Sequence, residues 1–176
     1  MKLKCIQDER EYVRTIEKMG ERLVLFKTSV VNKGKGMYYH FGFEDNRKPP
    51  MDLAINPNSG IVEYVSCFAM GEKLVVRTVK NDIDYKDGMV IIEDVSVDEQ
   101  HFDLGWHSFE KKFEIVISNN DIFILDEELF SESLQAYRID KSNYLLFSND
   151  SEFRGILLKN ITEKEWEEIR NTQCFS

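Results

Sequence analysis

The chain has 176 residues, which is enough for one domain with a buried core of its own. Apolar residues make up 42% and charged residues 31% of it, a balance typical of a folded protein and not of a disordered chain. The 32 Asp and Glu residues outnumber the 23 Lys and Arg residues, so the net charge is −9. Because nucleic acids and anionic membranes are bound through basic side chains, this charge argues against both as direct partners.

Charge is unevenly distributed along the chain. Residues 1–50 contain 11 basic and 7 acidic residues, a net charge of +4, whereas residues 51–176 contain the other 12 and 25, a net charge of −13. One interpretation is an acidic surface that binds a basic partner. The other is that the basic segment folds back against the acidic remainder and partly neutralises it. The sequence leaves both open.

The sequence has neither a targeting signal nor the cysteine pattern of a secreted protein. Its basic start is followed by Gln7-Asp8-Glu9-Arg10, where a signal peptide would need an apolar stretch. No stretch approaches the roughly 18 apolar residues of a membrane span. The three cysteines are far apart and odd in number: Cys5, Cys67 and Cys174. These features predict a cytoplasmic protein with reduced thiols.

The segment after the N-terminal residues has helix signals. Asp8 to Glu11 resembles a capping box, in which each side chain satisfies a backbone amide of the first helical turn. Apolar residues at helical spacing follow, and then a glycine that would end the helix: Tyr12, Val13, Ile16, Met19 and Gly20. We therefore expect a helix over residues 8–20.

A second helix is predicted near the C-terminal end of the sequence. Thr162 and Glu165 form another capping box, and Ile161 and Trp166 stand in the positions of a hydrophobic staple. Trp166 and Ile169 give this segment a narrow apolar edge. We expect a short helix that packs on the surface of the domain through that edge.

Between these segments, short apolar stretches alternate with turns, which predicts strands. The first two strands are residues 23–26 and, after a glycine-rich turn, residues 37–43. Four hairpins are predicted across turns: 53–55 with 61–65, 113–117 with 121–125, 136–139 with 144–147, and 74–76 with 89–92. Because short turns join antiparallel strands, we expect a single α+β domain over residues 1–176. Its large, mostly antiparallel sheet is curled or split and has a short helix near each terminus.

Residues 96–108 form the longest interruption of the strand pattern, and a loop of that length in a compact domain is often functional. Aromatic anchors inside charged rims dominate many protein interfaces. We therefore predict a partner-binding site in and beside this segment, formed by Asp94, Asp98, Glu99, Asp103 and Trp106. A second acidic candidate is Asp126, Glu127, Glu128 and Glu132.

Metal binding is the alternative role for the same segment. His101, Asp103 and His107 have the side chains that zinc or iron prefers, and His40 could join them from elsewhere. The two histidines of the segment are six residues apart, which matches no local ligand motif. We therefore predict no metal and no cofactor, with a polar loop as the simpler interpretation.

Glu63 is unusual because it lies in a stretch, residues 61–68, that is apolar on both faces and so resembles a central strand. A carboxylate buried there could act as a general acid or base. The alternatives are a solvent-facing position or a set of structural hydrogen bonds. Signatures of a nucleophile are absent from the chain, so no catalytic residue is assigned.

The favoured hypothesis from sequence is an acidic protein-binding module with a basic protein partner. Its sharpest form is an immunity-type inhibitor that neutralises a cationic toxin domain such as a nuclease, because negative charge would speed association and imitate phosphate. One alternative is a small-ligand-binding protein or enzyme with a pocket in the curled sheet, with Glu63, His40 and tyrosines as its polar groups. The other is a structural or regulatory subunit without catalysis. The oligomeric state is left open.

Overall fold

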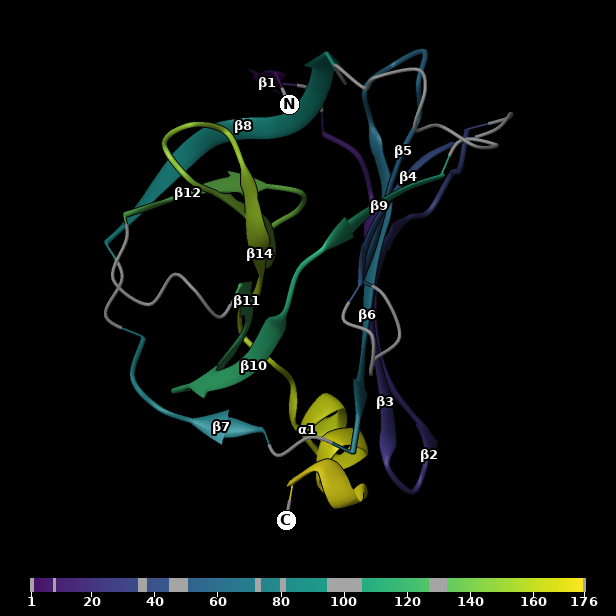
Figure 1. Ribbon diagram of the computed structural model, residues 1–176, viewed down its shortest axis with the longest axis vertical. Helices are drawn as coiled ribbons and strands as arrows, with labels where there is room; N and C mark the ends of the chain where they lie inside the picture. The colour runs from purple at the N-terminus through teal and green to yellow at the C-terminus, as the bar shows by residue number, and fades with distance from the viewer. Residues whose placement is uncertain are drawn as a thin grey trace.

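The structure is a computed structural model that describes residues 2–7, 9–34, 38–44, 51–71, 74–79, 82–94, 106–126 and 133–175. The described part is mostly β-structure, in two sheets that lie side by side with a short helix at one end (Figure 1). Sheet A has the strand order β1 (Lys2–Ile6), β8 (Ile83–Asp94), β12 (Leu134–Arg138), β13 (Asn143–Phe147), β14 (Phe153–Leu158), β11 (Asp121–Asp126), β10 (Phe113–Ser118) and β7 (Val75–Val76). Sheet B has the order β2 (Tyr12–Gly20), β3 (Leu23–Val30), β6 (Val62–Met70), β5 (Met51–Ile55), β4 (Tyr39–Glu44) and β9 (Trp106–Glu110).

Most neighbouring strands are antiparallel, as the sequence predicts. The expected hairpins β5–β6, β10–β11 and β12–β13 all form. Among the described strands, three ladders are parallel and join distant segments of the chain: β4 with β9, β7 with β10, and β8 with β12. The β-structure is therefore split into two largely antiparallel sheets, and sheet A is mixed.

The fourth predicted hairpin, residues 74–76 with 89–92, is wrong. β7 instead pairs in parallel with β10, and β8 lies between β1 and β12. The prediction assumed that strands adjacent in sequence also pair, which is the common arrangement but not a rule. Here only a short stretch of chain separates β7, the last strand in the order of sheet A, from β8, the second strand.

That short connection requires sheet A to be rolled. In the strand order, β7 and β8 are six spacings apart, about 29 Å in a flat sheet. The seven Cα steps from Val76 to Ile83 span at most about 25 Å. The sheet must therefore curve to bring the two strands together (Figure 1). In its middle strand, Gly155 has a φ of +144°, and a Cβ there would run into the backbone of Ile124, so a side chain would be strained.

Two groups of buried side chains lie on the two faces of sheet A. The larger packs between the sheets and includes Phe26, Leu53, Ile124 and Phe147. The smaller lies on the opposite face of sheet A, where Val79 of the β7–β8 connection and Ile83 of β8 pack against it. Its members are Val116, Phe123, Leu125, Leu134, Ala136, Leu146 and Leu157. Sheet A is thus covered on both faces by its own chain.

The helix expected over residues 8–20 is wrong: Tyr12–Gly20 is β2, the edge strand of sheet B. The backbone carbonyl of Glu11 accepts from the amide of Val31, as in a strand pair, and Asp8 lies outside the described residues. β-Branched residues such as Val13 and Ile16 favour a strand. Arg14 and Lys18 lie on the inner side of β2, where both donate to polar groups at α1. Two charged residues on the inner side hide the alternation of apolar and polar residues that would identify a strand.

The second predicted helix, α1 (Glu163–Arg170), is confirmed together with its capping box. The hydroxyl of Thr162 accepts from the amide of Glu165, and the Glu165 carboxylate accepts from the amide of Thr162. Trp166 and Ile169 are buried in the larger core cluster, and a short 3-10 turn, Gln173–Phe175, follows. Within the described residues, no helix has the length and apolar character needed to cross a membrane.

Candidate binding sites

The structure describes two of the five predicted partner-binding residues, Asp94 and Trp106. Asp94 ends β8 in sheet A, and Trp106 begins β9 at an edge of sheet B, where its Cα pairs with that of His40. The other three residues lie outside the described part of the chain: Asp98, Glu99 and Asp103. The acidic segment therefore leaves one sheet and enters the other.

Asp126, the first residue of the second acidic candidate site, does not lie on the surface. Asp126 is 4% exposed, and its Oδ2 lies 3.2 Å from both Lys111 Nζ and Arg154 Nη1. Its charge is neutralised inside the protein, so it does not contribute to an acidic surface. The remaining members lie outside the described residues: Glu127, Glu128 and Glu132.

The basic N-terminal part of the chain folds back onto acidic residues that follow it. Lys2 and Lys4 pair with Glu93 at 3.6 and 2.9 Å, and Arg14 pairs with Glu165 at 2.6 Å. These ion pairs join residues of the +4 segment to residues of the −13 segment. The interpretation that the two segments partly neutralise each other is supported.

Glu63 is buried and has structural partners. Both of its carboxylate oxygens accept from the amide of Gly34 at 3.2 Å, and Oε1 also accepts from Asn56 Nδ2 at 3.1 Å. A Cβ at Gly34 would collide with these same two side chains. Of the roles considered for Glu63, the set of structural hydrogen bonds is the one that the geometry shows, because it ties the segment after β3 to the β5–β6 turn.

His40 belongs to a polar cluster on the outer face of sheet B, the face turned away from sheet A. Its Nδ1 lies 3.2 Å from both oxygens of Asp52, and the Tyr64 hydroxyl also donates to Asp52. Burial and the hydrogen bond to this carboxylate raise the pKa of Tyr64 above its ordinary value. Lys27 Nζ lies 4.6 Å from the centroid of the Tyr64 ring. The register aligns Trp106, His40, Ala54 and Tyr64 in one row across four strands.

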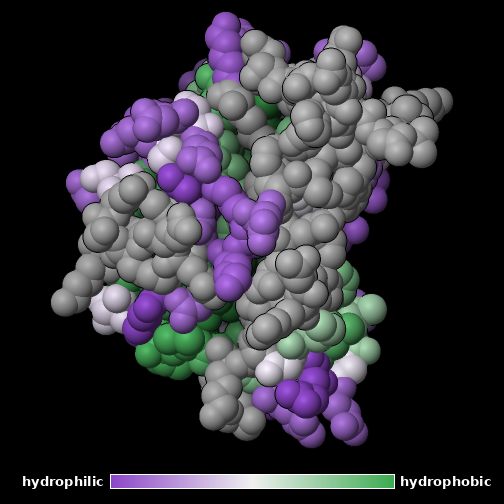
Figure 2. Space-filling model, viewed as in Figure 1, coloured by the Kyte–Doolittle hydropathy of each residue, from purple (hydrophilic) through white to green (hydrophobic). Residues whose placement is uncertain are grey.

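Apolar side chains occupy the same face nearer to the β2–β3 turn. We call this set the sheet B patch: Met19, Leu23, Leu25, Phe68 and Met70. Met19 is 53% and Met70 44% exposed, and the other three are half-buried. Figure 2 shows apolar residues gathered over the lower part of β2, β3 and β6. The sequence predicted strands at residues 23–26 and 61–68 but a helix at Met19, and it did not predict that this apolar side would lie open.

A pocket of about 630 Å³ opens where β8, β12, β13 and β14 meet in sheet A. Its lining comes from β8 and from the ends of the other three strands, together with Gln7: Gln7, Tyr85, Lys86, Asp87, Gly88, Arg138, Tyr144 and Lys159. The rings of Tyr85 and Tyr144 meet edge to face, with centroids 5.3 Å apart. The sequence predicted a pocket in a curled sheet with tyrosines, but Glu63 and His40 do not line this one.

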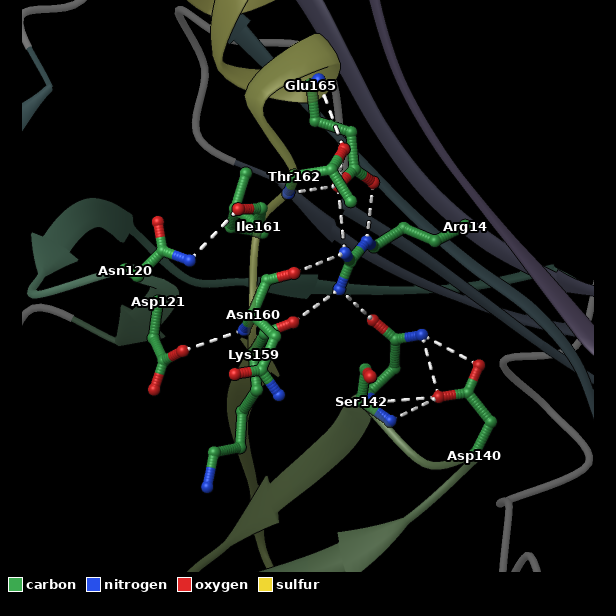
Figure 3. Close-up of polar contacts among 11 residues, drawn as sticks. Arg14, Asn120, Asp121, Asp140, Ser142, Lys159, Asn160, Ile161, Thr162 and Glu165 are labelled. Atoms are coloured by element: carbon green, nitrogen blue, oxygen red, sulfur yellow. Dashed lines mark hydrogen bonds and ion pairs between the residues drawn. The ribbon is translucent and has the colours of Figure 1, made fainter.

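Arg14 connects β2 to α1 and to sheet A, as Figure 3 shows. Its Nε and Nη2 donate to the two oxygens of Glu165 at 2.6 and 2.8 Å. Nη1 donates to the carbonyl of Lys159 at 2.7 Å and to Asn143 Oδ1 at 3.3 Å, and Nη2 donates to the carbonyl of Asn160 at 3.2 Å. With its polar atoms engaged in this way, Arg14 is a structural clamp between the two sheets.

The described residues contain no group of three or more side chains that could hold a metal ion. His101 and Asp103 lie outside these residues, so the metal hypothesis for their segment stays a prediction. No family model matches the chain, and no curated protein matches its sequence.

Proposed function

We propose that the protein is a protein-binding module that docks a basic partner on the outer face of sheet B. The observation that carries this proposal is the sheet B patch, where two methionines are 53% and 44% exposed beside Leu25 and Phe68. Contiguous apolar patches on a protein surface mark interaction sites more often than isolated apolar side chains do. Methionine suits such a role because its flexible, polarisable side chain adapts to a partner.

Acidic residues beside this face favour a basic partner. Glu17 is aligned with Leu25 on the outer face and Glu21 lies in the β2–β3 turn; both are exposed. Neither forms an ion pair with another described residue. In the sequence, the acidic segment with Asp98, Glu99 and Asp103 precedes Trp106, which begins β9 at the far edge of the sheet. Lys27 lies on the same face, so the acidic segment supplies most of the negative charge that would steer a cationic partner into place.

The sharpest form of this proposal is an immunity-type inhibitor of a cationic toxin domain such as a nuclease. Such an inhibitor would cover the face that binds the phosphates of the toxin's substrate, and its carboxylates would occupy their places. The net charge of −9 and the acidic segment ahead of Trp106 support this form.

Affinity capture from the native cell's lysate tests the proposal with matched variants. The double substitution Met19→Ser/Met70→Ser removes the exposed part of the sheet B patch, and Val76→Ser is the control, because Val76 is 72% exposed in sheet A. We expect the wild type and the control to retain one basic protein that high salt releases. The double variant should lose it, and the purified partner should bind that variant at least about 10-fold more weakly.

The same experiment identifies other occupants of the patch. Purified protein that self-associates, and that the double substitution returns to monomers, would assign the patch to a second copy of the chain. Failure to retain a basic protein, or its equal retention by the double variant, would overturn the proposal.

Replacing Asp98, Glu99 and Asp103 with Lys should slow association and weaken its salt dependence. An unchanged rate would remove that segment from the interface.

A further inference from the structure

We propose that the pocket of sheet A binds a small organic anion, one with a carboxylate or phosphate group next to a planar ring. This site lies on the other sheet from the sheet B patch, so it is independent of the proposed protein partner. The argument rests on the charges of the lining, its two aromatic rings, and the way the backbone of Lys159 is held.

The pocket continues the second core of sheet A to the end of the sheet. In three strands, every second residue lies on the face of that core, and the side chains on this face change from apolar to polar along each strand. The residues are Leu134, Ala136 and then Arg138 in β12, Ile83 and then Tyr85 in β8, and Leu157 and then Lys159 at β14. The pocket therefore lies where this face changes from apolar to polar, and its own lining is mostly polar, with two tyrosine rings. Ligands often bind in such openings at the ends of rolled sheets.

Cations dominate the lining, although the whole chain is acidic. The lining contains three cations, Lys86, Arg138 and Lys159, and one carboxylate, Asp87. Lys86 pairs with Asp84 outside the lining, and Arg138 lies 3.8 Å from a carboxylate oxygen of the highly exposed Glu9. Lys159 forms no ion pair with any other described residue. Lys159 is therefore the lining cation whose charge is available to an anion, and it carries the argument.

The aromatic side chains add a preference for a planar group. Lys159 Nζ lies 4.9 Å from the centroid of the Tyr85 ring, and Tyr144 meets that ring edge to face. A ligand ring could pack against these tyrosines while its anionic group reaches the ammonium. Aromatic pairs and charge-assisted hydrogen bonds both gain strength where water is partly excluded.

The backbone under Lys159 is fixed before any ligand arrives. Its carbonyl accepts from Arg14 Nη1 at 2.7 Å, and its amide donates to the carbonyl of Ser142 at 2.7 Å. Figure 3 shows the Lys159 side chain extending away from the Arg14 clamp. The clamp thus sets the direction of the side chain that would hold the anion, which lowers the conformational cost of binding.

An NMR titration of the full chain tests the proposal with phenyl phosphate, benzoate and inorganic phosphate, and with benzyl alcohol as the uncharged control. We expect the amides of Gly88 and Lys159 to shift with phenyl phosphate or benzoate, less with inorganic phosphate, and not with benzyl alcohol. The stronger of the two aromatic anions identifies phosphate or carboxylate as the preferred group.

Substitution of Lys159 assigns the binding to the pocket. Lys159→Met should weaken binding at least about 10-fold, equivalent to about 1.4 kcal/mol, while Lys164→Met on the exposed side of α1 should not change it. Arg138→Gln provides a second variant with the same expected direction, should Lys159→Met disturb the fold. The proposal is overturned if no aromatic anion shifts these amides at millimolar concentration, or if both pocket variants bind as well as the control.

Discussion

The outer faces of the two sheets differ in what covers them. In sheet A, the face turned away from sheet B is covered by the chain itself, and Phe123 and Leu146 are buried there. In sheet B, the outer face has side chains of similar character, yet Phe68 is half-buried and Met70 is exposed. A sequence that predicts a strand with two apolar faces is therefore compatible with two environments. It can lie inside a rolled sheet, or it can present one face to a partner.

The same substitution on the two outer faces should give very different losses of stability. Phe123→Ala removes a ring from a packed cluster and should lower the free energy of unfolding by about 3–5 kcal/mol. Phe68→Ala should cost about 1 kcal/mol or less, because that ring is already partly in water. Urea unfolding of the isolated protein measures both. Equal losses would mean that the outer face of sheet B is as well packed as that of sheet A.

The clamp between the sheets should be nearly as important as the core. Arg14→Met leaves the Glu165 carboxylate without its bidentate partner in a site where both side chains are largely buried. We expect a loss of about 3 kcal/mol in the free energy of unfolding, since one partner of a buried pair is left behind. The control is Arg170→Met, because the Arg170–Glu163 pair is exposed and should contribute about 1 kcal/mol or less. Similar losses for both variants would argue that Arg14 is not a clamp.

The sequence predicted much of the local structure of the protein. Short turns with asparagine and serine identified the β10–β11 and β12–β13 hairpins, and reciprocal side-chain bonds identified the start of α1. These features are decided by neighbouring residues, so a local pattern is enough. The stretch at residues 61–68 was predicted to be a central strand, and β6 does have a neighbour on each side. That its outer side lies open could not be read from the pattern.

Long-range pairing was the part that the sequence could not supply. β2 resembled a helix because Arg14 and Lys18 interrupt its inner face, and their partners are about 150 residues further along the chain. The parallel ladder of β7 with β10 likewise depends on the roll of the whole sheet. The sequence allowed for a pocket in a curled sheet but did not identify its lining, because Tyr85, Arg138 and Lys159 come together only through long-range strand pairing.

The pH dependence of stability should separate the clamp from the rest of the charged surface. Burial pushes the pKa of Glu165 upward, but hydrogen bonds from Arg14 and Thr162 outweigh it and bring the pKa below its ordinary value of 4.5. A carboxyl group with a lowered pKa in the folded state stabilises the protein above its unfolded pKa. That contribution disappears as the pH falls through the lower folded value.

Glu165→Gln should therefore make the free energy of unfolding less dependent on pH below about 4.5 than in the wild type. Glu167→Gln is the control, because Glu167 is exposed on the same helix and forms no ion pair with a described residue. Urea titrations at several acidic pH values measure the slope for each variant. If Glu167→Gln reduces the pH dependence of the free energy of unfolding as much as Glu165→Gln does, that dependence comes from the overall charge of the helix. The contact of Glu165 with Arg14 would then have no special part in it. A flatter slope for Glu165→Gln alone would show that the contact between Arg14 and Glu165, which joins sheet B to α1, is a point at which acid destabilises the fold.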